Sequence, residues 1–338
     1  MRIAVIGAGG WGTALASLLV SSGHDVCLWV RRTVLCEQLR DKRENSPYLP
    51  GISLPEALAY TTSLAEATSQ AELLVLAVPS HVMREVALAL KPRLERTSLL
   101  VSVSKGIEEE TLQTMSAVLI EVLGASLRER LAVFSGPSFA AEVARGLPTA
   151  VTVAAQVADV YATVQRVFVS SRFRVYTTAD VVGVEIGGAV KNVIAIAAGV
   201  SDGLGYGHSA RAALITRGLA EIVRLAVRLG AEPQTLSGLS GMGDLVLTCT
   251  SDLSRNHRVG IHLGKGEDIG SVLQGMTMVA EGVRTCRSVF SLAQRLSVEM
   301  PIVEQVYALL YTGKPPRQVV VDLLAREVKP ELDRKSVV

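Results

Sequence analysis

A glycine-rich turn directly after the first apolar strand most constrains what this chain can fold into. Residues 2–6 read RIAVI, residues 7–12 read GAGGWG, and an apolar helical stretch follows. This is G-x-G-x-x-G in the required context of strand, turn and helix. Gly7 permits the tight turn, Gly9 lets the backbone approach a pyrophosphate, and Gly12 lets helix and strand pack closely. Because a helix start offers unpaired N–H groups to phosphates, the pattern predicts a dinucleotide site; the alternative is a glycine turn without a ligand.

The first 180 residues alternate β-rich runs with helical patterns. Seven runs are predicted strands: Arg2–Ile6, Val26–Val30, Leu73–Ala77, Leu99–Val103, Leu131–Phe134, Ala150–Ala154 and Phe173–Tyr176. Helical patterns lie between them at Thr13–Ser21, Val82–Leu90, Thr111–Leu123 and Val157–Phe168. Continuous apolar strands indicate a sheet covered on both faces, and the alternation is typical of a parallel, doubly wound sheet. Residues 1–180 are therefore predicted to form a Rossmann-type α/β domain.

After residue 180 the pattern changes to long helical segments. These lie at Val182–Val200, Ala210–Leu229, Val279–Leu296 and Ile302–Tyr311, separated by Gly, Pro and Ser clusters. No strand pattern of equal quality occurs there. We therefore expect an all-helical domain over 181–330 and a charged tail over 331–338.

Composition excludes several classes of protein. The 34 Lys and Arg nearly balance the 32 Asp and Glu, which argues against a general nucleic-acid binder. No uninterrupted apolar run reaches the roughly 18 residues that a membrane helix needs, and Gly7 interrupts the first apolar run too early for a signal peptide. The four cysteines contain no C-x-x-C pair and suit neither a disulfide framework nor a zinc site. We expect a cytoplasmic protein without a metal.

The end of the second strand carries Arg31 and Arg32. A site specific for NAD usually has an acidic residue here to bind the ribose 2′-hydroxyl. Arginine instead pairs with a 2′-phosphate, so we predict that NADP(H) binds at least as well as NAD(H). The alternative is that both arginines are ordinary surface charges.

Three further segments follow strand ends, where doubly wound sheets bind their ligands. Lys105 is placed to meet an anionic substrate, and Gly136 and Ser138 form another potential anion or hydroxyl site. His81 is a possible acid–base group, although a packed or merely neighbouring histidine is the more common case. For Lys105 the alternative is a solvated loop lysine.

The helical half contains charged residues in apolar surroundings. Gly187, Gly188 and Lys191 share one helix face, so the glycines predict close approach of something to that face. Desolvation would favour neutral Lys191 and make proton exchange feasible near neutral pH. Asp244, in a glycine-rich turn, could hold the Lys191 ammonium or a substrate hydroxyl. Ser254, Arg255 and Asn256 add donors suited to a phosphate or carboxylate.

Eight segments, in order along nearly the whole chain, resemble bacterial NAD(P)-dependent glycerol-3-phosphate dehydrogenase. They are GAGGWGTALA (7–16), NSPYLPG (45–51), SKG (104–106), SGPSFAAE (135–142), GGAVKNVIAIAAG (187–199), GLSGMGDL (238–245), SRN (254–256) and VAEG (279–282). The resemblance implies reduction of dihydroxyacetone phosphate to sn-glycerol 3-phosphate for phospholipid synthesis. It also implies a Rossmann domain, a helical domain similar to that of 6-phosphogluconate dehydrogenase, and a homodimer.

The matched motifs also imply residue roles. Lys191 is the acid–base residue. The substrate site is lined by Lys105, Gly136, Ser138, Lys191, Asp244, Ser254, Arg255 and Asn256. The cofactor side comprises Gly7, Gly9, Gly10, Trp11, Gly12, Arg31, Arg32, Tyr48, Lys105, Ala140, Arg255, Val279 and Glu281. Many relatives have serine where this chain has Gly10.

The proposed chemistry requires two halves that face each other across a gap, with Lys191 polarising a ketone oxygen and donating its proton. One alternative is a β-hydroxyacid or ketopantoate-type reductase, which would act on a carboxylate substrate. Another is a regulatory module that binds NADP(H) without turnover. Neither the oligomeric state nor feedback inhibition follows from the residues themselves.

Overall fold

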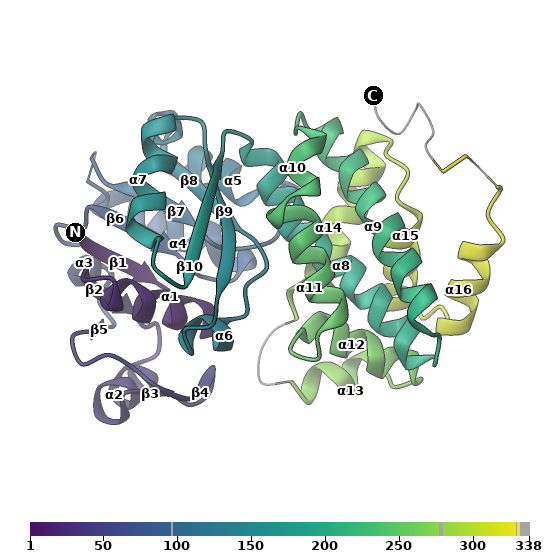
Figure 1. Ribbon diagram of the computed structural model, residues 1–338, viewed down its shortest axis with the longest axis horizontal. Helices are drawn as coiled ribbons and strands as arrows, with labels where there is room; N and C mark the ends of the chain where they lie inside the picture. Colours follow the sequence, from purple (N-terminus) through teal and green to yellow (C-terminus); the bar gives the residue numbers. More distant parts are fainter. Residues whose placement is uncertain (96, 277–279, 329, 332–338) are drawn as a thin grey trace. The chain divides into compact units, whose positions relative to one another are not determined.

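The structure is a computed structural model that describes residues 1–331 except 96, 277–279 and 329 (Figure 1). The chain divides into two compact units, each with its own hydrophobic core. Unit 1 comprises Met1–Ser104 and Met115–Val181, and unit 2 comprises Lys105–Thr114 and the chain from Val182 onward.

Unit 1 is built on an eight-stranded sheet in the order β10-β9-β8-β7-β6-β1-β2-β5. Its strands are β1 (Arg2–Ile6), β2 (Asp25–Trp29), β5 (Ala59–Thr61), β6 (Leu73–Leu76), β7 (Leu99–Ser102), β8 (Leu131–Ser135), β9 (Thr149–Ala155) and β10 (Phe173–Thr178). A separate two-stranded hairpin is formed by β3 (Glu44–Asn45) and β4 (Leu49–Ser53). All seven predicted strands are present, whereas β3, β4 and β5 were not predicted.

The sheet departs from a purely parallel arrangement at one edge. Strands β1, β2, β5, β6, β7 and β8 pair in parallel, but β9 pairs antiparallel with β8, and β10 is parallel to β9. The connection between β8 and β9 contains only the five-residue α6 (Ala140–Ala144). That helix rises about 8 Å, too little to carry the chain back along strands of about 20 Å. The next strand therefore runs in the opposite direction.

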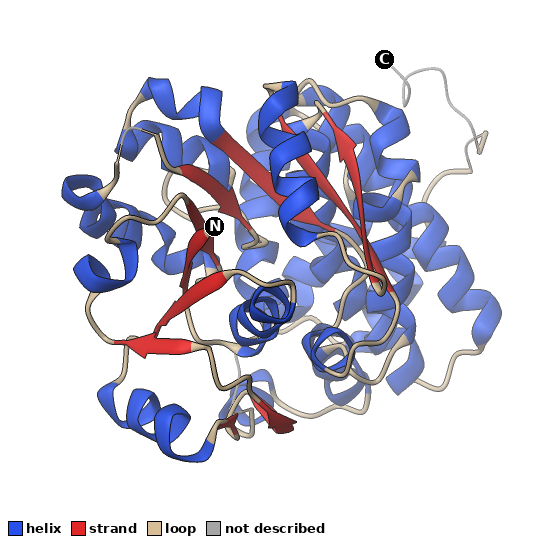
Figure 2. Cartoon of the chain, turned by 60° about the vertical axis from the view of Figure 1, so that its left-hand side comes forward, coloured by secondary structure: helices blue, strands red, loops and turns tan. Residues whose placement is uncertain are grey.

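Helices cover both faces of the sheet, as the continuous apolar strands predicted (Figure 2). They are α1 (Gly10–Ser21), α2 (Thr33–Lys42), α3 (Leu64–Thr68), α4 (Met83–Leu90), α5 (Met115–Leu123), α6 and α7 (Ala158–Phe168). Alternate residues of β1 show the two layers. Ile3 and Val5 pack with α1 and α7, while Ala4 and Ile6 pack with α3, α4 and α5.

From Val182 onward, the described residues of unit 2 form helices joined by turns and loops, without a strand. Its helices are α8 (Val181–Gly203), α9 (His208–Arg228), α10 (Pro233–Ser237), α11 (Asp244–Thr250), α12 (Arg255–Gly264), α13 (Ile269–Gln274), α14 (Glu281–Leu296), α15 (Pro301–Tyr311) and α16 (Pro316–Leu324). Among the described residues, α8 alone is long and apolar enough to cross a membrane by length and composition, but 83% of its apolar window is buried inside the protein. It is the core helix of this unit.

Paired glycines bring α8 and α12 into backbone contact. A Cβ on Gly199 would lie 2.0 Å from the His257 carbonyl oxygen, and one on Gly260 would lie 2.1 Å from the Ile196 carbonyl oxygen. Any side chain at these positions would push the two helices apart. The glycines therefore fix the start of α12 against the helix that carries Lys191.

Residues 105–114 group with unit 2, although the sequence placed them in a continuous first domain. Lys105 forms an ion pair with Asp244, and Ile107 is buried in the helical core. The helix predicted from Thr111 begins only at Met115, because Leu112 has a φ of +60° and Thr114 pairs with Ile107 in an isolated β-bridge. A positive φ is incompatible with a continuous right-handed helix.

Candidate active site

The glycine turn has the geometry that a dinucleotide pyrophosphate requires. Gly7 has a φ of +118°, and a Cβ there would lie 2.7 Å from the Ala77 carbonyl oxygen. A Cβ on Gly12 would lie 1.9 Å from the Gly7 carbonyl oxygen. By contrast, within the described part of the chain a Cβ on Gly9 would meet nothing within 4 Å, and no side chain caps the start of α1. The first N–H groups of α1 therefore remain available to a phosphate.

Four predicted cofactor residues gather at the start of α1 within unit 1. The Tyr48 carbonyl oxygen would be 2.7 Å from a Cβ on Gly10, and the Ala140 Cβ would be 3.7 Å from it. Trp11 packs against Phe134, with ring centroids 6.3 Å apart. Glycine at position 10 thus lets the hairpin loop lie against the helix start, which a serine would oppose.

The two arginines lie after β2, as predicted, and both are exposed. Arg32 donates a hydrogen bond to the Tyr48 hydroxyl (3.0 Å), and its guanidinium carbon lies 5.7 Å from the centre of that ring. The Tyr48 ring therefore orients one guanidinium at the place where an acidic residue would select NAD.

The other strand-end residues lie in turns of unit 1. Gly136 has a φ of +147°, and a Cβ there would lie 2.8 Å from the Val151 Cα. The Ser138 hydroxyl donates to the Gly136 carbonyl oxygen (3.0 Å). His81 is exposed in the 3-10 turn Ser80–Val82. Gly136 is thus needed for backbone packing, whatever else its turn contacts.

Unit 2 brings two lysines onto one buried carboxylate. The Nζ of Lys105 lies 2.7 Å from Oδ2 of Asp244, and the Nζ of Lys191 donates to Oδ1 of the same residue. Lys191 also donates to the Thr248 hydroxyl (2.8 Å), which itself donates to the Asp244 carbonyl oxygen (2.6 Å). Asp244 is 1% exposed and Lys191 is 7% exposed.

Burial and the lysine–carboxylate contacts shift both pKa values. Burial lowers the pKa of Lys191 to about 8, against the opposing effect of the Asp244 carboxylate. Burial alone would raise the pKa of Asp244, but Lys105 and Lys191 bring it below its ordinary value. Asp244 therefore stays ionised while Lys191 exchanges its proton near neutral pH. These properties suit a general acid–base pair, in which Asp244 holds and orients the ammonium.

Close backbone packing positions this cluster. A π-helical turn, Leu239–Gly243, directly precedes Asp244. A Cβ on Gly187 would lie 2.5 Å from the Ser240 carbonyl oxygen. The predicted close approach to the glycine face of α8 is thus confirmed, and the approaching group is the turn that carries Asp244.

The start of α12 presents the predicted donors in different ways. Ser254 caps the helix by accepting from the His257 N–H (3.2 Å). Asn256 is buried, donates to the Asn192 side-chain oxygen (2.9 Å) and accepts from the Gly282 N–H (3.0 Å). The side chain of Asn256 thus joins α8, α12 and α14, while Arg255 is exposed.

Glu281 is the first residue of α14, and its carboxylate interacts electrostatically with Arg255. Val279 lies outside the described residues. Two further residues of this region were not predicted from the sequence: Thr248, which contacts Lys191, and Asn192, which contacts Asn256. Thr248 could have been found, since it follows Asp244 by four positions on one helix.

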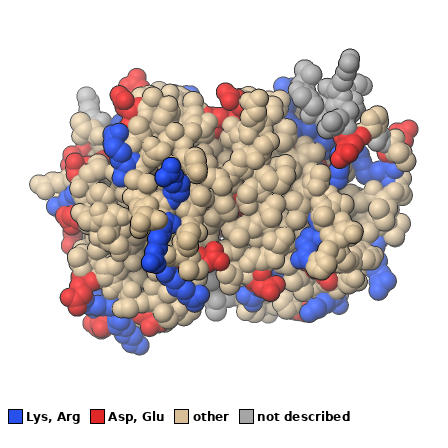
Figure 3. Space-filling view, in the orientation of Figure 1, with Lys and Arg blue, Asp and Glu red and all other residues tan. Residues whose placement is uncertain are grey.

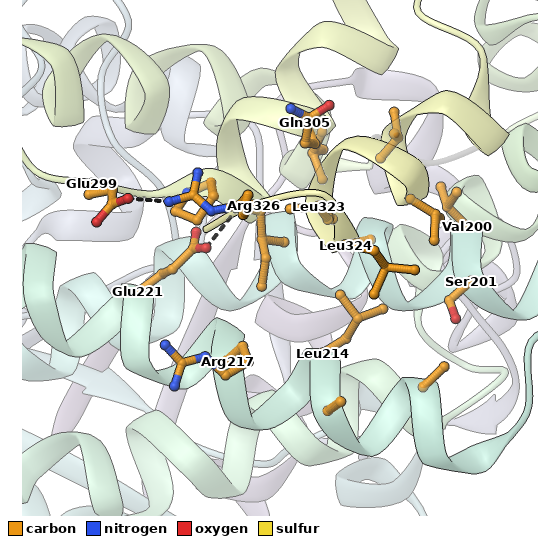
Figure 4. A pocket seen from close by; sticks show the side chains of 18 of the residues that line it. Val200, Ser201, Leu214, Arg217, Glu221, Glu299, Gln305, Leu323, Leu324 and Arg326 are labelled. Carbon is orange, nitrogen blue, oxygen red and sulfur yellow. Dashed lines mark hydrogen bonds and ion pairs between the residues drawn. The ribbon is translucent and has the colours of Figure 1, made fainter. Parts of the chain in front are cut away.

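A cavity of about 1280 Å³ lies elsewhere in unit 2, between α9, α15 and α16 (Figure 4). None of the predicted site residues that the structure describes lines it. Four arginines and four glutamates occur among its described lining residues, and Arg326 pairs with Glu299. The lining therefore has no excess charge for a phosphorylated substrate. Basic and acidic side chains are also interspersed among uncharged ones on the face in Figure 3.

Comparison with protein-family models gives two matches. Residues 2–160 match the NAD-dependent glycerol-3-phosphate dehydrogenase N-terminus, and residues 180–321 match the C-terminus of the same family. Together the two matches cover most of the chain.

Curated proteins are also similar in sequence to this chain over nearly its full length. The protein named glycerol-3-phosphate dehydrogenase (NAD(P)+) from Geobacter sulfurreducens is 56% identical over 330 residues, with 98% of each chain covered. Its namesake from Geobacter sp. strain M21 is 55% identical, also with 98% of each chain covered.

Solved structures show the same relationship. Glycerol-3-phosphate dehydrogenase from Coxiella burnetii has a TM-score of 0.92 and 39% identity, covering 96% of this chain and 99% of its own. A ketopantoate reductase from Ralstonia eutropha, at 16% identity and a TM-score of 0.58 with 95% and 100% coverage, shares the fold alone.

Proposed function

The chain belongs to the NAD-dependent glycerol-3-phosphate dehydrogenase family, and we propose that it reduces dihydroxyacetone phosphate to sn-glycerol 3-phosphate. The observation that carries the mechanism is the buried pair of Lys191 and Asp244, with the pKa of Lys191 lowered to about 8. We propose that the product supplies glycerophospholipid synthesis.

The residues of the glycine turn fit a dinucleotide. In this proposal the first N–H groups of α1 bind the pyrophosphate, and Gly9 leaves room for it. Trp11, Tyr48 and Ala140 form the walls beside the helix start. When bound, NAD(P)H supplies the hydride that reduces the ketone carbon.

Lys191 acts as the general acid. As the ketone carbon is reduced, negative charge develops on its oxygen, and the Lys191 ammonium donates a proton to it. Asp244 keeps the ammonium in place, because its carboxylate accepts from Lys191 and from Lys105. In the oxidation of glycerol 3-phosphate, neutral Lys191 takes the hydroxyl proton instead.

Substrate phosphate is assigned to the cationic and hydroxyl donors of the predicted set. Arg255 offers a forked donor on the first turn of α12, beside the capping residue Ser254. Asn256 keeps one amide hydrogen beyond its bond to Asn192. Lys105, Gly136 and Ser138 complete the proposed substrate residues.

Cofactor preference is assigned to Arg31 and Arg32, which we propose pair with a 2′-phosphate. The Arg32–Tyr48 contact supports this assignment, because it fixes a guanidinium after β2. Arg31→Asp should then lower the ratio of kcat/KM for NADPH to that for NADH about tenfold or more. An unchanged ratio would reduce Arg31 to an ordinary surface charge.

We also propose that the enzyme is cytoplasmic and works as a homodimer. Light scattering of the purified protein tests the second statement, with a mass near twice 35.9 kDa expected. A mass of one chain would contradict it.

The direct test of the function is NADPH oxidation with and without dihydroxyacetone phosphate, repeated with NADH. Oxidation that depends on dihydroxyacetone phosphate is expected. Ketopantoate is included because a reductase for carboxylate substrates shares the fold. Turnover with ketopantoate alone would replace the proposed activity, and cofactor binding without any turnover would indicate a regulatory module.

A further inference from the structure

The NSPYLPG segment, which has no assigned role for its first residue, forms the β3–β4 hairpin. Asn45 begins this segment and is 0% exposed. Its side-chain nitrogen donates to the Ala8 carbonyl oxygen (3.0 Å) and to the Thr13 hydroxyl (2.7 Å). Both partners belong to the glycine turn and the first turn of α1. One amide therefore joins the hairpin to the phosphate-binding turn.

The peptide that Asn45 holds adjoins Gly9, where backbone must approach the pyrophosphate. The Ala8 carbonyl oxygen is fixed by a donor from a distant segment instead of by its own turn. Fixing a carbonyl fixes the plane of the peptide that follows it, and with it the direction of the next N–H group. Asn45 thus determines the orientation of the Gly9 N–H group.

Asn45 also fixes the loop that carries Tyr48. The Asn45 carbonyl oxygen accepts from the Tyr48 N–H (3.1 Å), which closes the loop of the hairpin. Tyr48 in turn touches the start of α1 through its carbonyl oxygen and receives Arg32 on its ring and hydroxyl. A chain of contacts thus runs from the glycine turn through Asn45 and Tyr48 to Arg32.

Asn45 also has an acceptor that the fold does not use. Its Oδ1 is buried and has no hydrogen-bond partner among the residues that the structure describes. A buried acceptor without a partner costs free energy, so stability alone does not explain an asparagine here. Orientation of the amide is nevertheless fixed, because only Nδ2 can donate to the Ala8 carbonyl.

We propose that Asn45 is a positioning residue that couples the pyrophosphate turn to the 2′-phosphate end of the dinucleotide site. This inference rests on the proposed function, since it assumes that NADP(H) binds here. Asn45 itself need not touch the reacting atoms. It sets the geometry of the Gly9 N–H group and, through Tyr48, the position of the Arg32 guanidinium.

The test compares Asn45→Ala and Asn45→Asp with a matched control in the same hairpin. Glu44→Ala removes the bond from the Gly51 N–H to the Glu44 carboxylate (3.0 Å), which stabilises the hairpin without reaching the glycine turn. Asn45→Asp keeps the size of the side chain but cannot donate. Binding of NADPH and NADH is measured by fluorescence titration, together with KM and kcat.

Both Asn45 variants should raise the Kd for NADPH about tenfold and lower the NADPH-to-NADH preference, while kcat at saturating cofactor stays within about threefold. Glu44→Ala should leave Kd within about twofold. In the Asn45→Ala, Arg32→Ala double variant, the losses of preference should be less than additive, because both act through one guanidinium.

Two results would overturn the proposal. One is an NADPH Kd that neither Asn45 variant changes. The other is an equal loss of NADPH affinity in Glu44→Ala, since that would make Asn45 a general stabiliser of the hairpin. Wild-type protein that fails to bind NADPH would instead refute the proposed function. If Asn45→Ala does not fold, Thr13→Val removes one of the two contacts and should give a smaller loss of the same kind.

Discussion

The two units build their functional groups in opposite ways. In unit 1 the groups are backbone N–H donors at a helix start, and glycines provide the space. In unit 2 the groups are charged side chains, and the buried carboxylate of Asp244 forms ion pairs with both Lys105 and Lys191. Binding a phosphate needs fixed dipoles that do not titrate, whereas moving a proton needs a group whose pKa lies near the working pH. Substitutions should therefore affect binding in one unit and turnover in the other.

The largest expected effect is on turnover in unit 2. Lys191→Met should lower kcat for reduction by about 10²–10⁴-fold, because no acid remains to protonate the developing oxyanion. The Kd for NADPH should stay within about twofold. Steady-state kinetics and fluorescence titration measure the two quantities. Lys314→Met, a lysine paired with Asp322 away from the cluster, is the control. Near-normal turnover in the Lys191 variant would remove the assignment.

The next effect is a shift of pH dependence. Reduction requires protonated Lys191, so kcat should fall as pH rises through about 8. Asp244→Asn removes the carboxylate that raises the pKa of Lys191, while burial and Lys105 still lower it. In this variant kcat should therefore begin to fall at a lower pH, and kcat at pH 8 should drop about tenfold or more.

Thr248→Val is the matched control for that shift. It removes the neutral acceptor of Lys191 without changing any charge, so the pH at which kcat falls should change much less. Equal displacement in both variants would show that hydrogen bonding, and not the Asp244 charge, governs the proton affinity of Lys191.

Two alanine substitutions sharpen the comparison within unit 1. A Cβ on Gly12 would meet the Gly7 carbonyl oxygen at 1.9 Å, so Gly12→Ala should destabilise the fold by about 1–3 kcal/mol. Gly9→Ala meets no protein atom within 4 Å and should keep stability, yet weaken NADPH binding about tenfold. Denaturant unfolding and cofactor titration separate the two. Loss of stability in both variants would show that Gly9 is needed for folding, and would contradict the proposal that it leaves room for the cofactor.

The smallest effect concerns a carboxylate with no proposed part in the reaction. Glu221 accepts from the Ile302 N–H (2.7 Å) and the Val303 N–H (3.2 Å), and burial raises its pKa to about 7. Because its folded pKa exceeds its unfolded one, its stabilising contribution is present below about 4.5 and is lost as pH rises through about 7.

Glu221→Gln removes that dependence. The Tm of wild type should fall by about 2–4 °C more than that of the variant between pH 5 and 7.5. Glu327 also lines the cavity to which Glu221 contributes, but it is exposed, so Glu327→Gln should behave like wild type. Parallel Tm curves for wild type and Glu221→Gln would contradict a buried titrating carboxylate.

The same contrast explains what could be predicted from the sequence. The Gly7–Gly12 turn is a local motif, because one stretch of chain supplies the strand, the turn and the helix start. It was found from its glycine spacing together with its place between a strand and a helix. Continuous apolar runs likewise identified every long strand. Strand β9 was predicted, but its antiparallel direction was not, because strand direction depends on how far α6 carries the chain, which residue type does not reveal.

The site in unit 2 was predicted as separate residues but not as an arrangement. Lys191 and Asp244 were chosen from their surroundings and from the resemblance to a family. That Lys105 shares Asp244 could not be read from the sequence, because 139 positions separate these two residues. Asn45 lies in the matched segment NSPYLPG, but its contacts could not be predicted, because its partners are a backbone carbonyl and the Thr13 hydroxyl more than 30 positions away.

Donation of a proton from Lys191 to the ketone oxygen can be tested by a crystal structure with NADP⁺ and dihydroxyacetone phosphate, which cannot react together. The Lys191 Nζ is expected within about 3 Å of the ketone oxygen, with Asp244 still accepting from Lys191. A ketone oxygen bound by other donors, with the Lys191 amine directed away from it, would rule out Lys191 as the proton donor.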